Sequence, residues 1–292
     1  PFGDSSALPS LLVAKLARER VSVVLTGDGG DELFAGYPRV WKTYVADKWR
    51  RRIGRFGGRV LKAVGGNLYH LPGRVGALGH RTRTFGILIN QGAPAQYEAN
   101  PALLSMNEYD VLGERVRSVL RAHSPLEKSR NRFDLVTSEN EAERMMWHDV
   151  NFRLTSDYLT KVDSATMYYA LEARCPFLDI ELWQYAAKLT MLDRMPGGRR
   201  KGLLSDLAAD TLPKSAILRQ KQGFGIPFYE WLRGPWYGFW QDLFESSTSS
   251  RLGLLDDAGV RRMLEAHRNG KNHSVCLWNL AMLELWLRAN HF

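Results

Sequence analysis

Apolar and polar positions follow two different patterns over the first forty residues. From Leu8 to Leu16 apolar residues recur at helical spacing, and Asp4 and Ser5 before them suit a helix cap. Residues 21–25, VSVVL, are a continuous apolar run, typical of a strand buried on both faces. A glycine-rich turn and a fresh apolar run follow. The segment therefore predicts one unit of a parallel α/β sheet whose other strands lie before the first residue.

Beyond this strand the pattern is almost wholly helical, so we expect a mostly α-helical chain with at least one buried parallel strand. The last helix is apolar on nearly every face except at Glu284, as expected inside a large core. In chain order the pattern predicts one or two helices over residues 39–83 with a glycine-rich break at 65–80, a helix over 138–152, a helix from 159 that ends before Pro176, a loop over 218–236 and the buried helix over 274–289.

Composition places the chain among globular proteins, with 45% hydrophobic and 24% charged residues. No apolar run approaches the roughly 18 residues that a membrane span requires. The two cysteines, Cys175 and Cys276, form neither a disulfide framework nor a CxxC zinc pair. We therefore expect a reducing, cytoplasmic location.

The net charge of +9 is concentrated in one segment. Residues 39–83 hold twelve Lys or Arg against one acid, Asp47, which gives +11 and leaves −2 for the rest of the chain. Tryptophans and aliphatic residues are interleaved with these cations, so amphipathic helices with a solvated basic face are the simpler interpretation. A surface that docks on an acidic partner, a membrane or a nucleic acid is the alternative. No helix-turn-helix, zinc-finger or RNP-like pattern accompanies the charge, so no nucleic acid is expected as a partner.

Three carboxylates gather directly after the predicted strand, in VVLTGDGGDELFAGY. Ligands bind beyond the carboxyl ends of strands in open α/β sheets, which is where Asp28, Asp31 and Glu32 lie. Gly27 and Gly29 allow the backbone to approach a nucleotide, and carboxylates beside phosphates require a cation, usually Mg²⁺. The stretch predicts a magnesium–nucleotide site. A tight turn before a helix with an acidic first turn is the alternative.

Four motifs in order give the chain a family resemblance. LTGDGGDELFAGYPR, YLTKVDSATMYYALEARCPFLD, LPKSAILRQKQGFGIPFYEWL and LWNLAMLELWL resemble, in order and rough spacing, the class B glutamine-hydrolysing asparagine synthetases. They correspond to the carboxyl-terminal part of that family's synthetase domain, and the basic middle segment matches loosely. The resemblance implies an α/β fold, the parallel sheet of the adenine-nucleotide alpha-hydrolases and ATP-pyrophosphatases.

The resemblance also implies a reaction. ATP converts the aspartate β-carboxylate into β-aspartyl-AMP and pyrophosphate, and ammonia from glutamine displaces AMP. By this similarity the backbone of Thr26 and Gly27 contacts the nucleotide, with Gly29 in the same turn. Asp28 then takes part in forming or consuming the adenylate. Asp31 meets Mg²⁺ and pyrophosphate, with Glu32 as a third carboxylate.

Further residues take roles from the same resemblance. Lys221 matches the lysine that stabilises charge on the α-phosphate, which agrees with the electrostatic nature of adenylyl transfer. Lys161 and Asp163 match an L-x-K-x-D pattern and face either the active site or a helix-surface ion pair. Arg174 with Asp179 is interpreted as a structural pair. Ser164 departs from the family, which commonly has Arg or Lys there.

Two family features are absent from these residues. Neither the phosphate-gripping SGGxDS loop nor a cysteine nucleophile for glutamine hydrolysis occurs, and in the family both precede the position of Pro1. We therefore expect an incomplete synthetase domain. Its parts would be a nucleotide-binding strand, loop and helix at 1–38, a basic helical segment at 39–137 and a helical part at 138–292.

The expected partners are aspartate, ATP with Mg²⁺, and glutamine-derived ammonia from a separate amino-terminal domain, and a homodimer is compatible with this picture. Two other functions stay open. One is a related ligase that forms an acyl-adenylate on another acid, since β-lactam synthetases and lasso-peptide cyclases share the scaffold. The other is a non-catalytic docking module built on the basic segment.

Overall fold

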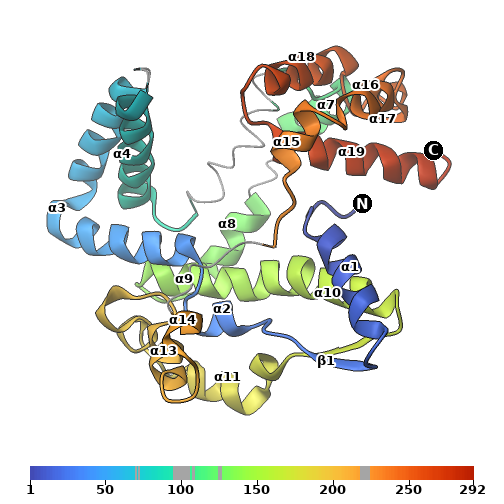
Figure 1. The fold of residues 1–292 in the computed structure, drawn as a ribbon. Coiled ribbons are helices and arrows are strands. Elements are labelled where there is room, and N and C mark those ends of the chain that lie inside the picture. Colours follow the sequence, from blue (N-terminus) through green and yellow to red (C-terminus); the bar gives the residue numbers. More distant parts are fainter. Residues whose placement is uncertain (70, 72, 95–105, 107–108, 124–126, 218–223) are drawn as a thin grey trace. The chain divides into compact units, whose positions relative to one another are not determined.

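The computed structural model describes residues 1–69, 71, 73–94, 106, 109–123, 127–217 and 224–292, which belong to two compact units (Figure 1). The first unit combines residues 1–13, 99–127 and 223–292, and the second combines residues 14–98 and 128–222. Helix α1 (Ala7–Arg18) contains the boundary at residues 13 and 14. Asp4 accepts a hydrogen bond from Ser6 N at 2.9 Å, which closes a turn directly before α1.

The second unit contains a parallel pair of strands, β1 (Val23–Leu25) and β2 (Glu172–Arg174), in which Val24 is opposite Ala173. The predicted parallel strand is confirmed. Its predicted burial on both faces is wrong for the described residues, because Leu25 is 74% exposed and the pair has no further strand beside it. The expectation that all partner strands lie before the first residue is also wrong, since β2 follows within this chain.

The helix predicted to end before Pro176 ends earlier. It is α10 (Leu159–Met167), and Ala170 follows it in the left-handed region with φ 53°. Leu171 N donates to Thr166 O at 3.0 Å, which closes the helix with the bonding pattern that glycine usually provides. The chain then extends into β2. Because alanine occupies the turn, no glycine marked this helix end in the sequence.

One long helical run precedes β2. Helix α9 (Glu141–His148) begins at Asn140, whose side chain accepts hydrogen bonds from Ala142 N and Glu143 N. It continues as the π-helix η1 (Asp149–Tyr158) and then as α10. The helix predicted over residues 138–152 is therefore confirmed in type and is longer than expected. Wide π turns occur often at functional sites.

The basic segment folds into two antiparallel helices, α3 (Pro38–Tyr69) and α4 (Gly73–Gln91), which lie side by side in Figure 1. Gly54 kinks α3 with φ 64°. The predicted helices are confirmed. The glycine-rich break predicted over residues 65–80 is wrong over most of its length, because α3 continues to Tyr69 and α4 begins at Gly73. A side chain at Gly65 would overlap the backbone of Arg83, and one at Gly79 would lie 2.5 Å from Leu68 C. These glycines let two helix backbones approach each other closely.

Short helices complete the second unit around the strands. Leu33, Phe34 and Ala186 are buried together there, with Phe177 and Trp183 packed against them. The elements not yet given are α2 (Gly30–Leu33), α8 (Glu127–Asp134, which begins at the unit boundary), η2 (Pro176–Leu178), α11 (Ile180–Ala186), α12 (Met191–Arg194), η3 (Pro196–Gly198), α13 (Gly202–Ala208) and α14 (Lys214–Ile217).

The first unit is helical and has its own aromatic core around Trp240, Phe244 and Leu277. Its helices are α7 (Glu114–Ala122), α15 (Phe228–Arg233), α16 (Tyr237–Phe244), α17 (Thr248–Arg251), α18 (Asp257–Arg268) and α19 (Ser274–Ala289). The predicted last helix is confirmed. The loop predicted over residues 218–236 is wrong where α15 forms, because Phe228 and Leu232 bury one helical face in this core.

Candidate functional site

The carboxyl ends of β1 and β2 meet at the start of the acidic loop. Thr26 N donates to Arg174 O at 2.8 Å, and Thr26 Oγ1 lies 3.1 Å from Cys175 Sγ. The loop that carries Asp28 therefore leaves the sheet at its carboxyl edge, where α/β sheets bind ligands. Since Thr26 N–H is engaged with the sheet, a contact from this residue to a ligand would come from its carbonyl or hydroxyl group.

The glycines of the loop have different reasons to be glycine. Gly29 has φ 92°, and a β-carbon there would lie 2.6 Å from Leu178 Cδ2 and 3.0 Å from Phe177 O. Both its backbone conformation and its closeness to η2 require glycine. A β-carbon on Gly27 would have nothing within 4 Å. Gly27 therefore leaves open space beside the backbone, as a site for a bound group would need.

Asp31 is held by a cation that the sequence did not reveal. Lys201 Nζ lies 2.8 Å from Asp31 Oδ1, and Lys201 N donates to Phe34 O at 3.2 Å. A β-carbon on Gly36 would overlap both Asp31 Oδ1 and Lys201 Cε, so a glycine makes room for this ion pair. Lys201 and Ala35 both have φ 52°. Left-handed non-glycine residues are strained, and such strain gathers at functional sites.

Glu32 is buried and engaged by a neighbouring hydroxyl group. Glu32 is only 3% exposed, and Tyr37 Oη donates a hydrogen bond to Glu32 Oε1 at 2.6 Å. Burial raises the pKa of Glu32 above its ordinary value, and the hydrogen bond from Tyr37 offsets this only in part. Burial, and then the charge of Glu32, also raise the pKa of Tyr37.

Aromatic and cationic side chains connect this pair to the long helical run. The rings of Tyr37 and Tyr158 stack with centroids 5.9 Å apart, and Lys161 Nζ lies 5.2 Å from the centroid of Tyr158. The guanidinium carbon of Arg39 lies 4.0 Å from the ring centroid of Tyr37. Arg39 Nε also donates a hydrogen bond to Asp149 Oδ2 at 2.8 Å. The π-helix thus supplies Asp149 and Tyr158, and Lys161 contacts the ring of Tyr158.

Other predicted residues lie apart from this cluster or outside the described residues. Asp28 is half-buried in the loop, whereas Asp163 is exposed on α10. Lys221 lies outside the described residues. The predicted pair of Arg174 with Asp179 is wrong. Arg174 Nε donates to Glu172 at 2.7 Å, and Asp179 caps α11 by accepting from Leu182 N.

We call residues 26–32 together with Tyr37 and Lys201 the acidic corner. It combines open backbone at Gly27, a carboxylate that attracts a cation and a buried carboxyl group with a hydroxyl partner. Within the described ranges no three His, Cys, Asp or Glu side chains are placed to hold a metal ion together. A magnesium ion here would take most of its ligands from phosphates and water, which is its usual behaviour.

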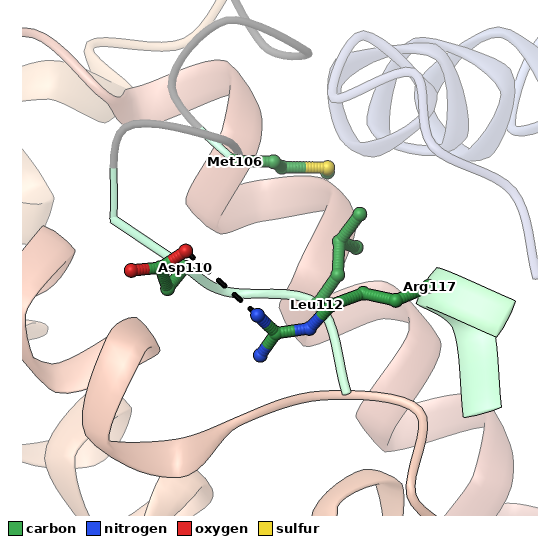
Figure 2. Close-up of a pocket in the computed structure, with 4 residues that line it drawn as sticks. All are labelled: Met106, Asp110, Leu112 and Arg117. Atoms are coloured by element: carbon green, nitrogen blue, oxygen red, sulfur yellow. Dashed lines mark ion pairs between the residues drawn. The ribbon is translucent and has the colours of Figure 1, made fainter. Parts of the chain in front are cut away.

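A separate pocket of about 240 Å³ lies in the first unit. Figure 2 shows it lined by Met106, Asp110, Leu112 and Arg117, with an ion pair of 3.8 Å between Asp110 and Arg117. None of the predicted site residues that the structure describes lines it. In the part of the chain that the structure describes, no helix combines the length and apolar character of a membrane span.

Comparisons with known proteins agree with the motifs. The family model described as "Asparagine synthase" matches residues 1–288. A Mycobacterium tuberculosis H37Rv protein named "Putative asparagine synthetase (glutamine-hydrolyzing)" is 30% identical over 300 residues, covering 98% of this chain and 42% of its own length. Asparagine synthetase (glutamine-hydrolyzing) 1 of Bacillus subtilis strain 168 is 26% identical over 291 residues, covering 99% of this chain and 44% of its own length. The chain thus spans less than half the length of these curated relatives.

Proposed function

Because the chain belongs to the asparagine synthase family, we propose that it is the carboxyl-terminal part of an ATP-dependent, glutamine-hydrolysing asparagine synthetase. The observation that carries the proposal is the match over residues 1–288 together with an acidic corner at the carboxyl edge of the parallel strands. The aspartate β-carboxylate would attack the α-phosphorus of ATP and expel pyrophosphate. Ammonia would then attack the acyl carbon, and AMP would leave.

The residues of the acidic corner fit a magnesium–nucleotide. Asp31 already attracts a cation, and Asp28 is three residues before it in the same loop. We propose that these two carboxylates hold Mg²⁺, which would neutralise charge on the pyrophosphate. Lys201 would then move from Asp31 toward a phosphate oxygen, a change that a flexible lysine permits.

Glu32 has a supporting role in this proposal. Glu32 is buried and its carboxylate accepts a hydrogen bond from Tyr37. This agrees better with orienting Asp31 than with binding a metal. Lys161 and Lys221 would place positive charge near the reacting phosphate, where donors aimed at developing charge are most effective. Asp163, which is exposed, would act only if the aspartate substrate or the rest of the protein approached α10.

The location and partners follow from the same proposal. Cys175 and Cys276 form no disulfide in the structure, and burial raises the pKa of the Cys276 thiol to about 12. Cysteines that form no disulfide support a cytoplasmic location. Ammonia would come from a glutaminase domain elsewhere in the full-length protein. A different acceptor acid is the second candidate, because Ser164 leaves an exposed position on α10 without the cation that the family resemblance leads us to expect.

The test is pyrophosphate release by the full-length protein with ATP, Mg²⁺ and aspartate. Replacing Asp31→Asn should lower the rate about 10²–10³-fold, because one electrostatic contact to the transition state is lost. The matched control is Asp206→Asn, which removes an exposed carboxylate paired with Arg199 and should leave the rate unchanged. Release that responds to another acid but not to aspartate would exclude the asparagine assignment and keep the ligase. A wild-type rate in Asp31→Asn would contradict the assigned site.

A further inference from the structure

Glycines bring the backbones of α3 and α4 close together over the outer half of their hairpin, beside Leu61 and Phe85, which pack against the buried Leu88 and Ile89. Gly58 and Gly65 are seven residues apart on α3, and Gly79 and Gly86 are seven apart on α4. Side chains at these four positions would collide with the facing helix. Several larger apolar residues of this half of α3 therefore lie outside the contact with α4 and are exposed.

Those residues form an exposed stripe on α3. Phe56 is 75% exposed, Val60 45% and Val64 47%. Their spacing of four places them along one face of the helix. On α4, Val75 and Leu78 are exposed as well. An apolar stripe on a solvated helix usually marks an interaction site.

A row of cations flanks the stripe. Arg52, Arg55, Arg59 and Lys62 are exposed, and none of them forms an ion pair with another described residue. Arg55, Arg59 and Lys62 recur at spacings of four and three, so they lie on the helix face beside the stripe, and Arg52 lies just before the kink at Gly54. Residues 48–97 contain ten Lys or Arg and no Asp or Glu. Two of these cations are paired, Arg51 with Asp47 and Arg50 with Glu141, and the hairpin therefore combines apolar side chains with an excess of positive charge.

We propose that this hairpin docks on an anionic lipid surface, with the stripe of Phe56, Val60 and Val64 entering the interface and the flanking cations on the lipid phosphates. Helices with one apolar face and a basic flank bind membranes in this way. A second copy of the chain is a poorer occupant because its hairpin would bring the same positive charge. Nucleic acid is poorer too, since two of the three stripe residues are valines, which do not stack on bases as an aromatic residue such as Phe56 can.

The test is co-sedimentation of the full-length protein with vesicles at about 50 mM salt. Vesicles of phosphatidylcholine with phosphatidylglycerol should bind it, and vesicles of phosphatidylcholine alone should not. Replacing Arg52→Gln, Arg55→Gln and Arg59→Gln together should weaken binding on the order of 100-fold, since each cation near the surface contributes roughly a fivefold effect. Replacing Phe56→Ser, Val60→Ser and Val64→Ser should weaken it by a similar factor.

The controls remove the same chemistry elsewhere in the second unit. Lys188→Gln, Arg200→Gln and Lys214→Gln remove three exposed cations, and Leu135→Ser with Leu192→Ser removes two exposed apolar side chains. Both sets should bind like wild type, and all variants should keep the wild-type circular dichroism because every substituted side chain is exposed.

Three results would overturn the proposal. The first is no binding to anionic vesicles, or equal binding to neutral ones. The second is a loss that the control sets reproduce. The third is retention on an RNA homopolymer or on an acidic protein without vesicle binding, which would assign the hairpin to that partner instead.

Discussion

Glu32 in the second unit and Glu284 in the first unit are both buried glutamates, yet their surroundings act on them in opposite directions. Glu284 is fully buried and accepts hydrogen bonds from Thr248 N at 2.9 Å, Ser249 N at 2.8 Å and Arg288 Nε at 2.7 Å. Burial alone would raise its pKa, but these donors outweigh burial and lower the pKa. At Glu32 burial prevails and the pKa is raised.

The two carboxylates have different roles, which follow from the groups around them. Glu284 holds the amino end of α17 against α19, so its charge is built into the packing of the first unit. Glu32 accepts a hydrogen bond from the hydroxyl of Tyr37, and the charge of Asp31 beside it adds repulsion. A carboxyl group held away from its ordinary pKa in a cluster with Asp31 and Lys201 is typical of a functional site.

Removing the carboxylate of Glu284 should lower the stability of the protein more than any other change considered. Glu284→Ala should lower the free energy of unfolding of the full-length protein by about 3 kcal/mol, because two backbone N–H groups and a guanidinium lose their acceptor. Urea unfolding followed by tryptophan fluorescence measures this. Glu265→Ala, at an exposed position on α18, is the control and should change the stability by less than about 0.5 kcal/mol. Equal losses in the two variants would show that the hydrogen bonds of Glu284 contribute nothing special.

The sequence predicted the acidic loop but not the residues and the strand that the fold brings beside it. The acidic loop after an apolar run predicted a ligand site at the end of a strand, and the structure places the loop at the carboxyl edge of β1 and β2. Lys201 could not be predicted, because it lies 170 residues after Asp31 and carries no local signal except a strained backbone that only coordinates reveal. β2 was missed for a similar reason, since the three residues EAR have no strand pattern of their own.

Glycine was the least reliable guide. In the acidic loop Gly29 marks a left-handed turn, as expected, but Gly65 and Gly79 lie inside helices where they allow close packing. Glycine in a sequence can therefore mark either the end of a helix or a close contact between two helices. Only the presence of a facing helix distinguishes the two cases. At the end of α10 the opposite error occurred, because Ala170 adopts the left-handed turn without a glycine.

A smaller effect is expected from removing the hydroxyl that faces Glu32. Tyr37→Phe should lower the free energy of unfolding by about 1–3 kcal/mol at neutral pH, because a buried carboxylate loses its donor. It should also slow pyrophosphate release if Glu32 orients Asp31. Tyr185→Phe, which alters an exposed tyrosine of α11, is the matched control. A Tyr37→Phe protein as stable as wild type would mean that the hydroxyl does not stabilise Glu32.

The smallest change is expected in the pH dependence of stability, where Glu32 and Glu284 should differ in sign. With a raised folded-state pKa, Glu32 keeps its proton longer in the folded than in the unfolded protein, so the wild type loses stability as pH rises above about 4.5 through that pKa. Glu32→Gln removes this loss and should gain stability relative to wild type over that window. Glu284 has a lowered pKa, so its contribution is present above about 4.5 and is lost as pH falls through the folded-state pKa.

Glu284→Gln should therefore be least destabilising in acid and most destabilising near neutral pH, whereas Glu32→Gln should become more favourable, relative to wild type, as pH rises. Urea unfolding of both variants and the wild type from about pH 3.5 to 7 gives two difference curves whose slopes have opposite signs. Parallel curves would contradict the comparison, because they would mean that hydrogen bonding does not distinguish the two sites. Opposite slopes would assign the raised pKa to the acidic corner itself, since the two variants make the same chemical change in one protein.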